Sequence, residues 1–201
     1  MKKLIVITHP ELLPHEPQLL TTALDAGIDY LHIRKPLATT VQIAELLLSL
    51  PQQYLSRIVL HDAHVLAQDY AIGGLHLNSR YPEAPHWWRG GVSRSCHSFE
   101  EIQQYKEGCN YLLLSPIYDS LSKVGYIANF THEELIAASH NGIIDDSVIA
   151  MGGITKENLL PALAYGFGGV AILGCVWCNP SRKHIITTIK NIKSQLQCYN
   201  L

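Results

Sequence analysis

The amino-acid sequence predicts an α/β fold, a (β/α)8 TIM barrel formed by a single domain over residues 1–201. Short apolar runs alternate with segments of helical periodicity, and the count is eight strands with about eight helical segments. The repeat of ~25 residues is the length of one β/α unit of such a barrel. A doubly wound open sheet is the competing architecture, but it usually has fewer strands, and no GxGxxG follows the first run.

The first half of the chain is predicted to contain four strands, at residues 4–9, 29–36, 57–62 and 74–79. They are rich in Leu, Ile and Val, and a proline ends each of the first two. Helical segments are expected between them, at residues 17–27, 39–50 and 63–73. Glycine is a usual C-cap, and threonines can cap the start of the second segment. The stretch YPEAPHWW, after the fourth strand, has no clear assignment.

The second half is predicted to contain strands at residues 90–96, 110–118, 148–151 and 170–173. Helices are expected at residues 97–108, 131–142, 155–166 and 181–197. Ser98 followed by Glu101 has the spacing of a capping box at the start of the first of these helices. A long polar loop runs from Asp119 to Phe130, and its length and Gly125 predict a lid over the site.

The composition excludes several classes of protein. Apolar residues make up 47% and charged residues 16%, which indicates a globular chain rather than a disordered one. Lys and Arg total 15 against 17 for Asp and Glu, so no global field attracts nucleic acid or an anionic membrane. Five cysteines do not form a disulfide framework, and we interpret the CxxC pair Cys175 and Cys178 as buried or incidental thiols.

The N-terminal stretch MKKLIVITHPELLP favours a first strand over a targeting segment. Its apolar run is too short to span a membrane, and no small-residue cleavage site follows it. A cytoplasmic protein is therefore expected, and the sequence leaves homo-oligomerisation open.

Glycines directly follow the last two predicted strands, as Gly152-Gly153 and as Gly174, which precedes Cys175. In a (β/α)8 barrel the loops after strands seven and eight commonly bind a phosphate. Bare backbone N–H groups at the start of a helix suit such an anion, and we expect one helix to open at Thr155. The alternative is that these glycines only permit tight turns. The pattern predicts a small phosphorylated ligand.

Polar side chains are plentiful at the other strand ends, which would share one mouth of the barrel. The candidates for binding or catalysis are His32, Arg34, Lys35, His61, Asp62, His76, Asn78, Arg94, Ser95, His97, Ser115 and Lys123. An inward Arg34 needs an anion, although an ion pair at the rim is the plainer alternative. Asp62 could bind Mg²⁺ or cap a helix, and His97 could transfer a proton or be a polar rim residue.

With these pieces in place, the chain resembles the thiamine phosphate synthase/TenI family over nearly its whole length. The resemblance is carried by the segments DYLHIRKP, VLHDAHVLAQDYAIGGLHL, SRSCHSFEEI, NYLLLSPIYDSLSK, VIAMGGITKENL and GGVAILG. It implies a barrel that binds a thiazole phosphate. In the synthase a hydroxymethylpyrimidine diphosphate is joined to that thiazole with release of pyrophosphate and help from Mg²⁺.

The resemblance also implies roles for individual residues. Arg34 and Lys123 would contact the pyrophosphate, Asp62 the metal, and Ser95 would match the family's serine after strand five. The backbone of the glycine pairs, Gly152, Gly153, Gly174 and Cys175, would bind the thiazole phosphate.

Three departures from the synthase pattern point to the TenI branch. Pro36 stands at the lysine position of RxK, His61 replaces the Asn of Asn-Asp, and Tyr81 replaces a second metal carboxylate. The known TenI member is a thiazole tautomerase that needs no metal, and its acid/base histidine matches His97. We therefore lean to tautomerase chemistry, with the synthase as the alternative and a non-catalytic thiazole phosphate-binding regulator as a third reading. An aldolase barrel is disfavoured because no predicted strand core contains a lysine.

Overall fold

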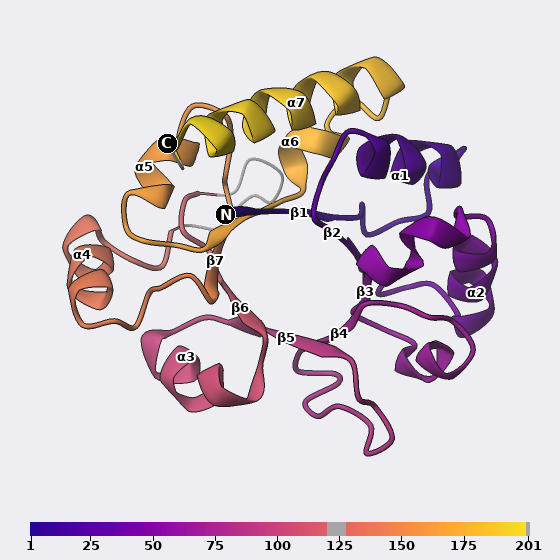
Figure 1. The fold of residues 1–201 in the computed structure, drawn as a ribbon, viewed down its shortest axis with the longest axis horizontal. Helices are drawn as coiled ribbons and strands as arrows, with labels where there is room; N and C mark the ends of the chain where they lie inside the picture. The colour runs from indigo at the N-terminus through magenta and orange to yellow at the C-terminus, as the bar shows by residue number, and fades with distance from the viewer. Residues whose placement is uncertain (120–127, 200–201) are drawn as a thin grey trace.

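The computed structural model describes residues 1–119 and 128–199, and it confirms the (β/α)8 barrel (Figure 1). Eight parallel strands close into one barrel in chain order. They are β1 (Lys3–Ile7), β2 (Tyr30–Ile33), β3 (Ile58–Leu60), β4 (Gly74–Leu77), β5 (Gly91–Cys96), β6 (Tyr111–Leu114), β7 (Val148–Met151) and β8 (Gly169–Ile172). All C-terminal strand ends therefore meet at one mouth, as the sequence predicted.

A ring of helices covers the outside of the barrel. The α-helices are α1 (Glu16–Asp25), α2 (Thr40–Leu48), α3 (Phe99–Tyr105), α4 (His132–His140), α5 (Leu159–Leu163), α6 (Gly174–Trp177) and α7 (Arg182–Tyr199). Short 3₁₀ turns are η1 (Gln52–Arg57), η2 (His64–Gln68) and η3 (Lys106–Gly108). The long α7 packs across α1, α5 and α6, which joins the two ends of the barrel wall (Figure 1).

Two predicted helices are shorter than expected. The segment at residues 63–73 is only the 3₁₀ turn η2, which buries just His64 and Leu66, so a longer helix would gain little from packing. The helix expected to open at Thr155 begins at Leu159. The Thr155 N–H donates instead to the Asn158 side chain at 2.8 Å, which holds this stretch in a turn.

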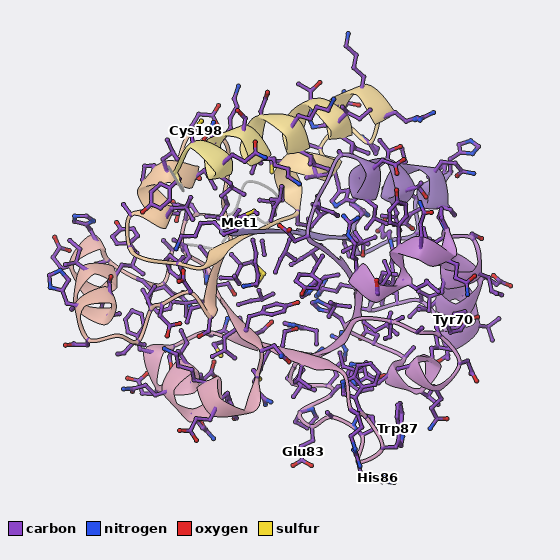
Figure 2. The ribbon with its side chains drawn as sticks, in the orientation of Figure 1. Met1, Tyr70, Glu83, His86, Trp87 and Cys198 are labelled. Atoms are coloured by element: carbon purple, nitrogen blue, oxygen red, sulfur yellow. The ribbon has the colours of Figure 1, made fainter. Side chains whose placement is uncertain are left out.

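The unassigned stretch after β4 contains no helix among the described residues. It is a loop that projects away from the barrel, with Glu83, His86 and Trp87 at its outer end (Figure 2). Its base is fixed where the Trp88 indole N–H donates to the Gly91 carbonyl at 3.1 Å.

The barrel interior is divided into an apolar half and a polar half. Strands β1 and β6–β8 fill one half with a small apolar cluster, namely Ile5, Ile7, Tyr111, Leu113, Ile149 and Ala171. Strands β2, β4 and β5 place buried polar groups in the other half, namely His32, His76 and Ser93, and His61 follows β3 directly. The larger apolar core lies between the strands and the surrounding helices. The polar half leads to the candidate site.

Lys35, directly after β2, points away from the mouth and is fully buried. Its ammonium donates to the carbonyls of His9 and Glu11 at 2.8 Å each and pairs with the buried Glu16 carboxylate. Burial lowers the pKa of Lys35, while Glu16 opposes that shift. The ion pair thus connects the loop between β1 and α1 to the segment that follows β2.

The described part of the chain contains no helix long and apolar enough to cross a membrane.

We predict that Lys35→Met lowers the free energy of unfolding by about 3–5 kcal/mol, because it leaves the Glu16 carboxylate buried and unpaired. Urea unfolding monitored by circular dichroism measures the change. The matched control is Lys2→Met, which removes a surface pair with Asp146 and should cost less than about 1 kcal/mol. Equal losses in the two variants would contradict a special role for the buried pair.

Candidate active site

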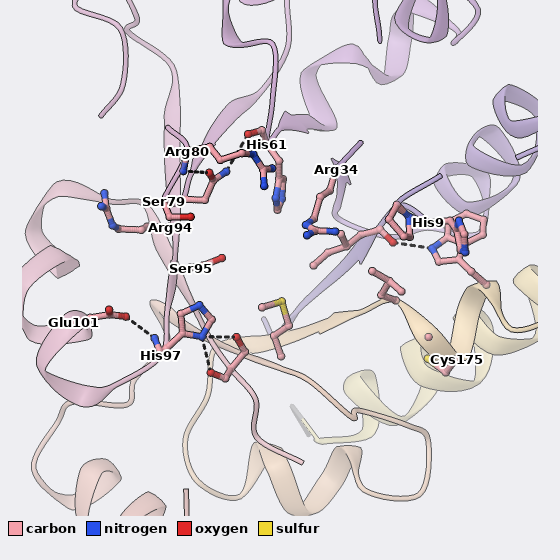
Figure 3. A pocket seen from close by; sticks show the side chains of 18 of the residues that line it. His9, Arg34, His61, Ser79, Arg80, Arg94, Ser95, His97, Glu101 and Cys175 are labelled. Carbon is pink, nitrogen blue, oxygen red and sulfur yellow. Dashed lines mark hydrogen bonds between the residues drawn. The ribbon is translucent and has the colours of Figure 1, made fainter. Parts of the chain in front are cut away.

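A cavity of about 870 Å³ opens at the C-terminal mouth of the barrel (Figure 3). Arg80 and Arg94 lie on one side of it, Arg34 lies apart from them, and Gly174 and Cys175 also line it (Figure 3). Ser95 and His97 line it from the end of β5, and His61 lines it from the end of β3. Polar groups from strands far apart in the sequence therefore converge in one hollow large enough for a small organic ligand.

Arg34 is a cation in this cavity without an ion-pair partner among the described residues. Its backbone is held by Thr8, whose hydroxyl lies 3.0 Å from the Arg34 N–H. Its guanidinium reaches into the cavity and makes no ion pair or hydrogen bond with any described residue (Figure 3). A half-buried guanidinium without an acceptor suits an anionic ligand, because the fork of donors matches phosphate oxygens.

Asp62 has a different neighbour from the one the sequence suggested. The Arg80 Nε and Nη2 atoms donate to its Oδ1 at 3.2 and 2.5 Å, and the Lys35 N–H donates to its Oδ2 at 3.3 Å. The Asn78 side-chain oxygen, which is close by, already accepts the N–H groups of Arg80 and Tyr81. Mg²⁺ needs several free oxygen ligands, and this set offers one carboxylate that a guanidinium already neutralises. These residues do not fit Mg²⁺ in this arrangement.

We predict that removing Arg80 makes the Asp62 carboxylate available to a divalent cation. Titration calorimetry with Mg²⁺ alone should show at least ~5-fold tighter binding to Arg80→Ala than to the unmodified protein, because a carboxylate released from a cation attracts a metal. Arg94→Ala is the control, since the Arg94 guanidinium donates to the Pro82 carbonyl and not to the Asp62 carboxylate. Tight Mg²⁺ binding by the unmodified protein would contradict the prediction.

The two glycine-containing loops differ in their relation to the cavity. Gly174 and Cys175 line it, and their N–H groups, at the first turn of α6, donate no hydrogen bond to another described residue. Gly152 and Gly153 are not lining residues. Their positive φ values of 94° and 63° and their contacts with Pro116 and Tyr118 explain why glycine is needed there. Phosphate binding by all four backbones stays a prediction, with Gly174 and Cys175 the better placed pair.

The surroundings of His97 favour one tautomer. Its Nδ1 lies 3.0 Å from the Ser115 carbonyl oxygen and 3.4 Å from the Ser115 hydroxyl, and its backbone N–H donates to the Glu101 carboxylate at 2.6 Å (Figure 3). The carbonyl, which only accepts hydrogen bonds, is the closer partner, and it favours a proton on Nδ1. In the neutral ring Nε2 then presents a lone pair, which makes His97 a competent general base.

A cluster of three buried histidines lies below the cavity. The His32 Nδ1 is 2.9 Å from His61 Nε2, and its Nε2 is 2.6 Å from the Tyr111 hydroxyl. The rings of His61 and His76 stack with centroids 3.9 Å apart. The sequence placed His32 at the mouth, whereas it lies beneath His61 and does not line the cavity.

This cluster is uncharged. Burial lowers the pKa of His32 to about 3, and burial together with the neighbouring histidines and Arg34 lowers the pKa of His61 and His76 well below the ordinary value. The three sets of nitrogens lie within 4.8 Å of one another, a spacing that suggests a metal site. However, the His61 and His76 ring planes are only 21° apart, so their in-plane lone pairs run side by side and do not meet at one ion.

We predict that the protein loses stability as the pH falls below about 6.5. In the unfolded chain the histidines bind protons near the ordinary value of 6.5, whereas His32 in the folded protein stays neutral down to about 3. Each buried ring therefore contributes a loss of up to ~1.4 kcal/mol per pH unit in that range. Urea unfolding at pH 7.5 and 5.5 measures the slope, and His32→Gln should reduce it. A slope that is unchanged by His32→Gln would contradict the assignment.

The remaining predicted residues are distributed as follows. Ser95 lines the cavity, whereas Lys123 and Gly125 lie outside the described residues, so a lid formed by residues 119–130 stays a prediction. Cys175 is half-buried and Cys178 is exposed, and neither forms a disulfide. Two residues that shape the site were missed from sequence: Arg80 as the partner of Asp62 and Tyr111 as the partner of His32. Of these residues, only Arg80 could have been found from the sequence pattern, because it lies in the polar stretch that follows β4. Lys35, a sequence candidate for the mouth, is instead buried against Glu16.

Comparison with known proteins identifies the family of the chain. A family model described as thiamine monophosphate synthase matches residues 4–176. The chain belongs to the thiamine monophosphate synthase family. The curated thiamine-phosphate synthase of Flavobacterium johnsoniae is 26% identical over 196 residues, which cover 92% of each chain. The crystal structure of a thiamine phosphate pyrophosphorylase from Bacteroides thetaiotaomicron superposes with a TM-score of 0.88 at 36% identity, over 97% of this chain and 98% of that one.

These similarities confirm the resemblance drawn from sequence and the interpretation of the chain as a thiamine-biosynthesis enzyme. They also support the synthase alternative better than the tautomerase lean, since the similar proteins carry the synthase or pyrophosphorylase name. A thiamine phosphate pyrophosphorylase from Pyrococcus furiosus, at 22% identity and a TM-score of 0.75, shows the same fold.

Proposed function

We propose that this protein is a thiamine phosphate synthase, which joins a hydroxymethylpyrimidine diphosphate to a thiazole phosphate and releases pyrophosphate. The observation that carries the proposal is the presence of two separate groups of anion-binding donors in one cavity. The Arg34 guanidinium, which has no acceptor in the described part of the chain, lies in one wall, and the N–H groups of Gly174 and Cys175 lie in another. A reaction between two phosphorylated substrates needs two such groups.

The chemistry follows from the charges. Departure of pyrophosphate from the pyrimidine methylene breaks a C–O bond and leaves a carbocation, and the thiazole nitrogen then forms the new C–N bond with its lone pair. Arg34 would neutralise charge that develops on the leaving group. Ser95 can donate its hydroxyl proton to an oxygen of the same group. The thiazole phosphate would be held at Gly174 and Cys175, which fixes the nitrogen for attack.

Mg²⁺ would, when bound with the diphosphate, neutralise part of its charge. The donor set around Asp62 does not favour it, so no step of this proposal depends on a protein-bound metal. In this proposal the Arg34 guanidinium supplies the positive charge. Lys123, outside the described residues, is a further candidate by resemblance.

One observation favours thiazole tautomerase activity as a second candidate. The favoured tautomer of His97 leaves its Nε2 lone pair available, as an acid/base that moves a proton on a thiazole requires. The synthase reaction has no evident need for this base. A regulator that binds thiazole phosphate without turnover is the third alternative, and it predicts binding with neither reaction.

We predict prompt pyrophosphate release when the purified protein is given both substrates. Arg34→Ala should lower kcat/KM at least ~100-fold, because a charge-neutralising donor to the leaving group is lost. Arg89→Ala is the matched control, since Arg89 lies on the projecting loop and donates to the His86 carbonyl. His97→Ala should change the rate by less than ~10-fold.

Three results would contradict the synthase proposal in different ways. Absence of pyrophosphate release, together with thiazole isomerisation that is lost in His97→Ala, would establish the tautomerase. Tight binding of thiazole phosphate without either reaction would establish the regulator. Full activity of Arg34→Ala would show that this side chain does not face the leaving group.

A further inference from the structure

A buried histidine bridges two hydroxyl groups beneath the cavity. His76 lies within β4 and pairs in register with Ser93 of β5. Its Nδ1 is 2.9 Å from Ser93 Oγ, and its Nε2 is 2.8 Å from Ser95 Oγ. Because residues two apart on a strand share a face, both serines point to the same ring. Ser93 is buried, whereas Ser95 lines the cavity.

The bridge has a direction, because the ring carries a single proton. Burial, with smaller contributions from His32, His64, Arg94 and Arg34, lowers the pKa of His76 well below the ordinary value, so the ring is neutral. One ring nitrogen then donates and the other accepts. Ser93 and Ser95 must therefore play opposite roles toward it.

Two arrangements satisfy this rule. In the first, Ser93 donates to Nδ1 and the Nε2–H donates to Ser95, which leaves the Ser95 proton free to point into the cavity. In the second, the Nδ1–H donates to Ser93 and Ser95 donates to Nε2, so that Ser95 shows the cavity only lone pairs. An anionic ligand oxygen repels those lone pairs and accepts the free proton, so it selects the first arrangement.

The surroundings of Ser93 favour the same direction. The Leu75 carbonyl, an alternative acceptor for its proton, lies at 3.5 Å, the limit of a hydrogen bond, whereas His76 Nδ1 lies at 2.9 Å. The Tyr111 hydroxyl contacts Ser93 and lies 2.6 Å from His32 Nε2. When the His32 Nε2–H donates to Tyr111, the phenol proton is directed at Ser93, and the Ser93 proton is directed in turn at His76 Nδ1.

We propose that His76, supported by Ser93, is a positioning residue that aims the Ser95 hydroxyl proton at an anionic phosphate or pyrophosphate oxygen in the cavity. No proton is transferred between residues in this arrangement, and the His76 imidazole stays neutral. The inference rests on the proposed function for the identity of the anion, and it adds two residues that do not line the cavity themselves.

Binding of inorganic pyrophosphate, measured by titration calorimetry, tests the proposal without any turnover. Ser95→Ala should weaken binding ~10-fold or more, as expected for a hydrogen bond to a charged group. His76→Leu, which removes the donor to Ser95, should weaken it ~5-fold. His76→Gln should bind within ~2-fold of the unmodified protein, since the glutamine amide can place a donor near the Nε2 position.

A double-mutant cycle separates positioning from a merely structural role. In the Ser95→Ala background, His76→Leu should cause no further loss of affinity, because its effect passes through the Ser95 hydroxyl. An equal loss in both backgrounds, or failure of His76→Gln to restore affinity, would overturn the proposal. So would unchanged affinity in Ser95→Ala. His64→Leu is the control, since His64 is also buried and bonds to the backbone of Leu60 and His76 rather than to the Ser95 hydroxyl.

Ser93→Ala provides a second route if His76→Leu does not fold. It removes the hydroxyl at Nδ1 and should weaken pyrophosphate binding ~2–5-fold, again only while Ser95 is present. A loss that persists in the Ser95→Ala background would overturn the proposal. The coupling between His76 and Ser95 in pyrophosphate binding is independent of pyrophosphate release from the substrates. The synthase assignment and this inference can therefore fail separately.

Discussion

The site depends on keeping the polar half of the barrel interior uncharged. His32, His61 and His76 occupy space that aliphatic side chains fill on the opposite side of the same barrel. A proton on any of these rings would place a cation in a region of low dielectric constant, next to two other histidines and near Arg34. Hydrogen bonds to hydroxyl groups and between the rings satisfy the nitrogens instead, so the floor of the cavity is polar but neutral.

A neutral floor changes what the charged residues at the mouth can do. Arg34 has no ion-pair partner among residues 1–119 and 128–199, which leaves it available for a ligand anion. Arg80 does the opposite, because Asp62 neutralises it and is itself withdrawn from metal binding. In the described part of the chain, the mouth therefore combines the Arg34 cation, the Arg80–Asp62 ion pair and backbone N–H groups at the start of α6. This is the electrostatic basis for proposing a reaction of two phosphorylated substrates rather than isomerisation of one.

Much of the site could be predicted from sequence because the barrel brings all C-terminal strand ends together. Arg34, Ser95, His97 and Gly174 each follow or end a predicted strand, and all four line the cavity. Neighbouring residues in the same stretch behave differently, which the pattern could not distinguish. Lys35 comes directly after Arg34, but its side chain is buried and pairs with Glu16. His32 precedes Arg34 by two residues, but it is buried and does not line the cavity. Gly153 is a glycine because Tyr118 and Asp119 leave no room for a side chain.

The sequence by itself determined the barrel, its single domain and the set of strand ends that form the mouth. These follow from local patterns, namely apolar runs, helical periodicity and turn residues, which repeat along the chain. Only the tertiary structure decided which polar groups are paired. Asp62 meets Arg80, His32 meets Tyr111, and His76 meets Ser95 across 18, 79 and 19 residues of sequence. Such contacts depend on the closure and register of the barrel, and no local pattern encodes them.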